Sequence, residues 1–240
     1  MSENDQRREQ ILDAAAAVII RLGYNKATMG DIAEEAGASR RTVYLYFKGK
    51  EELFEALLYR EYMHYSQAFL EQMEADPRGG TVGGSYRALF KAVSSRPLMA
   101  AIMRRDRRVI GNYLRKTENL FAGMSSGWDS ADFYRALQAA GALRKDIDAA
   151  VIAHVIEIIS YGQLMMEDFK PRERFPPDDE VAEALADMMD RALLPKEGGS
   201  SRRSKAIFRQ VTEAARARLE RSKRAREATQ TTRQGAANDD

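Results

Sequence analysis

Residues 28–53 read TMGDIAEEAGASRRTVYLYFKGKEEL and carry the start and stop signals of two short helices followed by a third. Thr28 can cap the first helix, whose acidic first turn suits the positive end of the helix dipole. Gly37 favours the left-handed conformation that ends a helix, and Ser39 can cap a second helix over residues 40–46. Two short helices joined by a glycine-containing turn are typical of a helix–turn–helix, whose second helix enters the major groove of DNA.

The second of these helices has the side chains of a DNA-reading element. Val43 and Phe47 lie four residues apart, so both can face a core while the rest of the helix surface stays free. Guanidinium groups bind guanine edges, and hydroxyl and ammonium groups bind phosphates. The alternative is a solvated basic turn between two core helices. The sequence predicts DNA contacts from Thr28, Ser39, Arg40, Arg41, Thr42, Tyr44, Tyr46, Lys48 and Lys50.

A wider stretch, about residues 7–58, resembles the DNA-binding domain of the TetR family of bacterial transcription regulators. The matching positions are Gly23, Tyr24, Thr28, Ile32, Ala33, Ala36, Gly37, Ser39, Tyr44, Phe47, Lys50 and Leu53. Arg41 departs from the pattern, because the family often has glycine there. The resemblance implies a three-helix DNA-binding domain and a helical body that dimerises through two helices and binds a small-molecule effector.

Composition excludes several other classes of protein. The chain has no cysteine and only two histidines, which are far apart in sequence, so neither a thiolate nor a histidine-rich metal site is expected. We find no phosphate-binding loop and no nucleophile elbow, so an enzyme and a bound cofactor are not expected. No apolar run is long enough to span a membrane, and the polar N-terminus is unlike a signal peptide. These features predict a soluble, cytoplasmic protein.

The charge is unevenly distributed along the chain. Residues 1–195 carry 26 basic and 30 acidic side chains, a net charge of −4, whereas residues 196–240 carry 12 and 6, a net charge of +6. Residues 205–226 have the pattern of a basic helix with a thin apolar stripe, preceded by a polar linker. We expect a loosely ordered tail; the alternative is a helix that forms on DNA or against the body.

The body reads as a series of helices. A long helix should run from Lys50 to about Ala75, because Pro77 follows. Residues 146–169 are apolar on more than one face, which predicts burial of one face in the core and of another against a second subunit. An amphipathic helix over residues 181–194 completes the expected dimer interface.

Polar residues on the apolar helix are candidates for a ligand pocket. His154, Glu157 and Tyr161 recur at helical spacing on one side, and Tyr113 and Trp128 are further candidates. The alternative is a satisfied core histidine and an interface carboxylate. Arginines 104, 105, 107 and 108 surround Asp106; this cluster is interpreted as a solvated helix junction rather than a phosphate contact.

Together these patterns predict an all-α fold. They predict a helix–turn–helix domain over residues 1–50, a ligand-binding and dimerisation domain over 51–195, and a basic extension over 196–240. The expected function is that of a homodimeric, sequence-specific repressor that a small molecule releases from its DNA operator. The alternative is a nonspecific or architectural DNA-binding protein that uses its basic tail.

Overall fold

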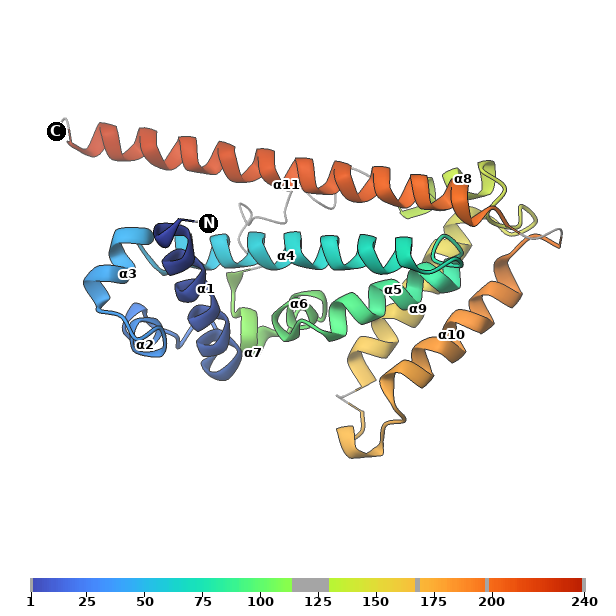
Figure 1. Cartoon of the computed structure of the whole chain (residues 1–240), viewed down its shortest axis with the longest axis horizontal. Helices are drawn as coiled ribbons and strands as arrows, with labels where there is room; N and C mark the ends of the chain where they lie inside the picture. Colours follow the sequence, from blue (N-terminus) through green and yellow to red (C-terminus); the bar gives the residue numbers. More distant parts are fainter. Residues whose placement is uncertain (1, 114–129, 167–168, 197–198, 239–240) are drawn as a thin grey trace.

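The computed structural model describes residues 2–113, 130–166, 169–196 and 199–238, and within these ranges every regular element is a helix (Figure 1). The all-α prediction is therefore confirmed. The helices are α1 Glu3–Leu22, α2 Met29–Glu35, α3 Arg40–Tyr46, α4 Lys50–Ala75, α5 Val82–Ser94, α6 Pro97–Met103, α7 Arg107–Ile110, α8 Ser130–Ala139, α9 Ala149–Met165, the 3₁₀ turn η3 Arg172–Arg174, α10 Asp178–Leu193 and α11 Ser201–Asn238.

Local capping fixes the two short helices of the N-terminal head. The Thr28 hydroxyl accepts a hydrogen bond from the Asp31 amide at 3.1 Å, and the Asp31 carboxylate accepts one from the Thr28 amide at 2.8 Å. Gly37 has φ +56°, the left-handed conformation expected after α2. The Ser39 hydroxyl then accepts from the Thr42 amide at 3.0 Å and starts α3. The turn that sets α3 against α2 is therefore encoded within residues 28–42.

Helices α1–α3 close around an apolar core that continues into the body. Val43 is fully buried and Phe47 is 2% exposed, so α3 is held by one face only. Helix α4 starts three residues after Phe47 and runs from this head into the body, as the sequence predicts. Fully buried residues shared by the head and α4 include Ile11, Leu12, Ile19, Ile32, Leu53, Phe54, Leu57 and Leu58.

In the body, α5 packs between α4 and α10, and α8 packs against α9 (Figure 1). The contact between α5 and α10 is close, because a Cβ atom at Gly83 would lie 2.0 Å from the carbonyl oxygen of Ala186. Asp190 of α10, 4% exposed, locks this contact. Its carboxylate accepts hydrogen bonds from the Gly83 amide at 2.9 Å, the Thr81 hydroxyl at 2.9 Å and the Arg78 guanidinium at 2.7 Å.

Replacing Asp190 with alanine should destabilise the fold by roughly 2–5 kcal/mol, because it leaves buried donors of Thr81 and Gly83 without an acceptor. Urea unfolding at a fixed protein concentration measures this loss. Asp187→Ala is the matched control, since Asp187 forms a surface pair with Arg191 at 2.7 Å. Equal destabilisation by the two substitutions would show that the buried carboxylate has no special part in joining α5 to α10.

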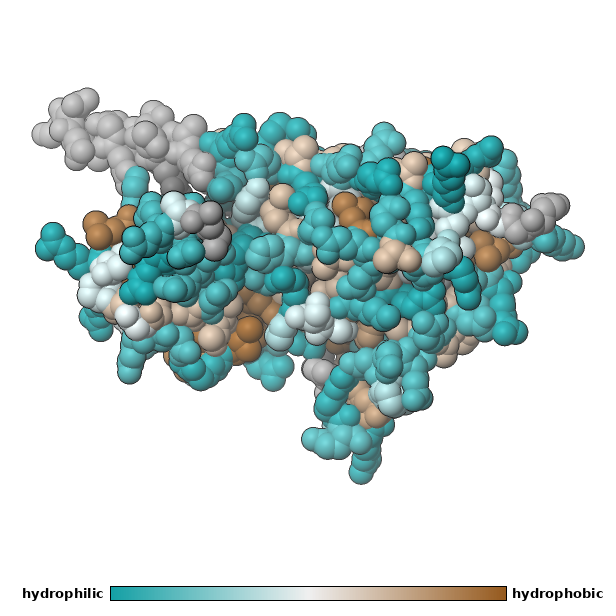
Figure 2. All heavy atoms as spheres, in the orientation of Figure 1, coloured by the Kyte–Doolittle hydropathy of each residue, from teal (hydrophilic) through white to brown (hydrophobic). Residues whose placement is uncertain are grey.

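The C-terminal extension differs from the expected loosely ordered tail. Residues 201–238 form one helix, α11, that lies alongside α4 (Figure 1). Leu219 is fully buried, and Phe208 packs into the core of the body. The thin apolar stripe is therefore sufficient to hold α11 against α4, because ion pairs between the two helices, such as Arg209–Glu74, flank the stripe. Figure 2 shows that the face formed by these two helices is mostly hydrophilic, with separated apolar patches.

None of the described helices has both the length and the apolar character that a membrane crossing requires.

Candidate functional site

The exposed face of α3 carries the residues predicted to read DNA. Arg41 is exposed, Tyr44 is 52% exposed, and Tyr46 is half-buried against the core of the head. The sequence interpretation missed Leu45, which is 77% exposed. Leu45 lies two residues after buried Val43, on the opposite side of the helix, so the helical period alone places it outward. An apolar side chain there can contact a thymine methyl group.

Arg40 spans the two helices of the motif. Its guanidinium lies over Gly30 of α2, at 2.6 Å from where a Cβ atom would be placed, so Gly30 leaves room for it. Hydrogen bonds from Thr28 and the nearby Arg40 charge hold the pKa of the Asp31 carboxyl below its usual value. The ionised carboxylate therefore stays available to cap α2.

The hydroxyl groups of Thr28 and Ser39, which the sequence predicts to contact DNA, cap the starts of α2 and α3 in the structure. Thr28 donates to Asp31 at 2.7 Å, while the Ser39 and Thr42 hydroxyls share a hydrogen bond of 2.8 Å. Thr28 and Ser39 remain exposed at the starts of α2 and α3, whose N-termini they fix. Lys48 lies after the end of α3 and is exposed as well.

Lys50 has a different place from the one predicted. Its ammonium donates to the backbone carbonyls of Tyr24 at 3.0 Å, Asn25 at 3.4 Å and Ala27 at 3.0 Å, and lies 4.7 Å from the Tyr24 ring centroid. An ammonium group has three hydrogens to donate, so these carbonyls use all of them. We therefore correct the assignment: Lys50 ties the start of α4 to the turn between α1 and α2.

Tyr113 lies at the junction of head and body and is fully buried. Its hydroxyl donates to Glu55 at 3.1 Å, and its ring packs edge-on against Phe54 at 5.0 Å and Tyr24 at 6.1 Å between centroids. The structure places Tyr113 in the packing of the head against the body, and its role in a ligand pocket stays a prediction. The pattern of aromatic residues could not distinguish a junction from a pocket.

An apolar cavity of about 350 Å³ lies between α5, α8 and α9. A smaller hollow of about 170 Å³ adjoins it and reaches Phe208 of α11. We call the two together the chamber. Residues that line both parts are Tyr86, Leu89, Tyr134, Ile156 and Ser160.

The polar groups of the chamber differ from those predicted. Glu157 and Tyr161 line it, whereas His154, with a side chain 74% exposed, does not. Trp128 lies outside the described residues. The sequence interpretation missed Tyr86, whose buried hydroxyl has no hydrogen-bond partner among the described residues. Burial raises the pKa of Tyr86 to about 12, so its hydroxyl is a neutral donor for a ligand.

The arginine-rich stretch forms a second hollow next to the chamber. This hollow measures about 540 Å³ and meets the chamber at Leu164. Arg108 pairs with Asp106 at 3.1 Å, and Arg105 has φ +52°, an unusual conformation for a residue other than glycine. The residues that line this hollow are Arg104, Arg105, Asp106, Arg107, Arg108, Leu164 and Met165.

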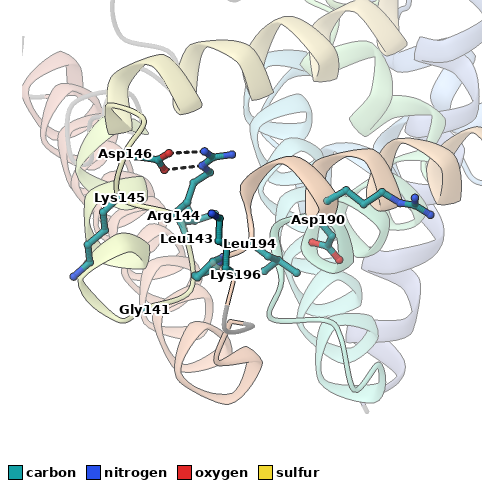
Figure 3. A pocket seen from close by; sticks show the side chains of 10 residues that line it. Gly141, Leu143, Arg144, Lys145, Asp146, Asp190, Leu194 and Lys196 are labelled. Carbon is teal, nitrogen blue, oxygen red and sulfur yellow. Dashed lines mark hydrogen bonds and ion pairs between the residues drawn. The ribbon is translucent and has the colours of Figure 1, made fainter.

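A third hollow, about 850 Å³, lies between the loop after α8 and the end of α10 (Figure 3). Figure 3 shows the side chains of Arg144 and Asp146 turned toward each other at its edge, where they form an ion pair. Asp190 is engaged in the contact between α5 and α10. The chamber, rather than this charged hollow, has the apolar lining and the few polar groups of a ligand site.

A row of apolar side chains on α9 is exposed. Val151, Val155 and Ile158 are 54%, 45% and 58% exposed, and recur at intervals of four and three residues. Met188 of α10 is 64% exposed. Contiguous exposed apolar surface of this kind is typical of a protein–protein interface.

Comparisons with known proteins agree with this geometry. Residues 11–57 match the family model of bacterial regulatory proteins, tetR family. The fatty acid metabolism regulator protein of Bacillus subtilis is 40% identical over 76 residues, which cover 32% of this chain and 37% of that relative. The match thus spans less than two fifths of the relative's length.

Two solved structures extend the likeness beyond the head. SmeT, the repressor of the Stenotrophomonas maltophilia multidrug efflux pump SmeDEF, is 27% identical with a TM-score of 0.50, over 79% of this chain and 91% of its own. FadR from Bacillus subtilis in complex with stearoyl-CoA is 18% identical with a TM-score of 0.55, over 75% and 96%. The second likeness concerns the fold alone.

Proposed function

The chain belongs to the TetR family of bacterial transcription regulators, and from this premise we propose that it is a homodimeric repressor that a small molecule releases from its operator. The proposal rests on the placement of α3: Val43 and Phe47 pack it against the core, and the opposite face of the helix is exposed. The test is to select operator fragments from the genome, then compare binding of the selected operator with that of random DNA at two salt concentrations. Equal affinity for both would contradict sequence-specific binding.

The exposed row on α9 supports the dimer. Val151, Val155 and Ile158 lie on one side of α9, where a second copy can cover them and form a four-helix interface with α10. Two heads held by a two-fold axis would read a near-palindromic operator, with half-sites on successive major grooves.

The alternative of an architectural DNA-binding protein has less support. Its sequence argument was the charge of the tail, but cations of α11 pair with α4, at Arg209–Glu74 and Arg226–Glu55. Charges engaged in this way attract phosphate less strongly than a solvated basic tail would.

The chamber supports a ligand with a long apolar part, and the arginine-rich hollow beside it supports an anionic head group. Glu157 lies seven residues before Leu164 on α9, about 10 Å along the helix from the residue at which the chamber meets the arginine-rich hollow. The FadR of Bacillus subtilis was solved with stearoyl-CoA, a molecule of this class. We propose a fatty acyl thioester or a related anionic amphiphile as effector.

Stearoyl-CoA is therefore expected to raise the melting temperature and to weaken operator binding, whereas CoA alone should do neither. The Leu89→Trp substitution should fill the chamber and abolish both effects. Substituting Arg105 and Arg107 with glutamine should weaken binding of stearoyl-CoA but not of octadecanol, because only the thioester carries phosphates. Unchanged stearoyl-CoA binding in the Leu89→Trp variant would place the ligand elsewhere.

A further inference from the structure

Helix α11 runs antiparallel to α4 and is attached to it at both ends (Figure 1). At the body end, the Lys205 ammonium donates to the carbonyls of Glu74 at 2.9 Å and Asp76 at 2.7 Å. At the head end, Arg226 pairs with Glu55 at 2.5 Å. These attachments are 21 residues apart on α11, about 30 Å along a helix. The helix therefore spans the distance from the body to the head.

The body end of α11 forms part of the chamber wall. The Phe208 ring packs edge-on against Phe133, 5.0 Å between centroids, and against Phe69, 6.1 Å between centroids. Phe208 lines the smaller part of the chamber beside Tyr86. A molecule that enters this part of the chamber therefore contacts a side chain of α11 and can displace it.

Near the head, α11 is connected to the DNA-binding domain through partly buried groups. Arg226 and Glu55 have side chains only 22% and 13% exposed. Glu55 also accepts the Tyr113 hydroxyl, and the Tyr113 ring contacts Tyr24. The Tyr24 amide in turn donates to the carbonyl of Val109 at 2.7 Å, a backbone hydrogen bond between head and body.

The carboxylate at this junction depends on its cation. Burial raises the pKa of Glu55, and the charge of Arg226 opposes that shift. Between Phe208 and the junction, nearer to the junction, the Tyr59 hydroxyl donates to Glu220, and the Lys223 ammonium lies 4.4 Å from the Tyr59 ring centroid. Contacts between α11 and α4 thus recur from the chamber to the junction.

We propose that α11 is a second connection between the chamber and the DNA-binding head, parallel to α4, and that Arg226 is the residue that positions the head through Glu55 and Tyr113. The proposal rests on the proposed function for its ligand, but the contacts that carry it need no ligand. A displacement of Phe208 moves α11 and changes the Arg226–Glu55 contact. Through Glu55 and Tyr113 this change alters the position of Tyr24 in the head.

The first test uses the ligand-free protein and a double-mutant cycle. Hydrogen exchange is followed in a peptide that covers residues 20–30, which contains the Tyr24 amide. The Arg226→Ala substitution should accelerate exchange there roughly tenfold, because the junction opens more often. Arg226→Lys should restore part of the protection, and Arg221→Ala, an exposed arginine on the same helix, should leave it unchanged.

The cycle then joins the two ends of α11. Phe208→Ala should change exchange at residues 20–30 in the wild-type background and have little effect in the Arg226→Ala background. Substitutions this far apart normally act additively, so non-additivity identifies transmission along the helix. Circular dichroism confirms that each variant is folded. Additive effects, or no effect of Arg226→Ala on exchange, would overturn the proposal.

The second test measures coupling to the effector, with stearoyl-CoA as the probe. Arg226→Ala should keep stearoyl-CoA binding within about threefold of wild type, because Arg226 does not line the chamber. It should weaken ligand-free operator binding, because loss of the Arg226–Glu55 contact has the same effect on the head as the ligand. Stearoyl-CoA should weaken operator binding of the wild-type protein by a factor of about 5–150, the usual range for allosteric coupling. In Arg226→Ala this factor should be about tenfold smaller, or stearoyl-CoA should have no effect on operator binding. Full retention of that factor would overturn the proposal. Failure of stearoyl-CoA to bind the wild-type protein would instead count against the effector class and leave the exchange test to decide.

Discussion

Replacing both Arg41 and Tyr44 with alanine is expected to weaken operator binding by roughly thirtyfold to ten-thousandfold. A bidentate arginine–guanine contact contributes about 1–3 kcal/mol to discrimination, and a dimer makes each contact twice. Both side chains lie on the exposed face of α3, so their removal leaves the core of the head intact. Fluorescence anisotropy with the selected operator, at fixed salt, measures the change.

The two single substitutions separate base reading from phosphate binding. Arg41→Ala should reduce the preference for operator over random DNA, whereas Tyr44→Ala should weaken binding to both equally. Arg202→Ala, an exposed arginine at the far end of α11, is the matched control for lost charge. Operator affinity within twofold of wild type in the double variant would remove α3 from the DNA interface.

Placing a glutamate at Ile158 is expected to convert the dimer into a monomer and to reduce operator binding by orders of magnitude. Ile158 is 58% exposed in the single chain, whereas its neighbour Ile159 packs against the core, so only the first is free to face a second copy. Burying an unpaired carboxylate twice in one symmetric interface costs several kcal/mol. Sedimentation velocity at micromolar concentration measures the assembly.

Ile20→Glu is the matched control, because Ile20 is 42% exposed on α1 in the head. It adds the same charge at an exposed isoleucine outside the proposed interface, and the dimer should persist. A monomeric wild-type protein, or an Ile158→Glu variant that still sediments as a dimer, would show that α9 is not the interface.

The two short helices of the head, α2 and α3, were predictable from the sequence because their start and stop signals are local. The caps at Thr28 and Ser39 act on amides three residues away, and the end of α2 needs only the left-handed conformation of Gly37. Leu45 was available from the same helical period. Its apolar side chain lacks the hydrogen-bonding groups on which the prediction of DNA contacts rests.

The assignments that failed depend on contacts between distant segments. Lys50 was expected at a phosphate, but its partners are carbonyls 23 to 26 residues earlier, which only the packing of α4 against the head brings near. Tyr86 became a chamber residue through the packing of α5 with α8 and α9. The attachment of α11 depends on acidic residues of α4 that lie opposite the arginines of α11. This alignment of the two helices cannot be predicted from the sequence of α11 alone.

The close contact at Gly83 determines which parts of the body can move. Since even a methyl group at this position would collide with the Ala186 carbonyl, α5 and α10 are separated by little more than their backbones. Neither helix can approach or slide without breaking the hydrogen bonds of Asp190. We therefore expect α5 and α10 to move as one rigid unit, and a displacement of the head relative to this unit to be accommodated in the short segments α6 and α7 that connect α5 to Tyr113.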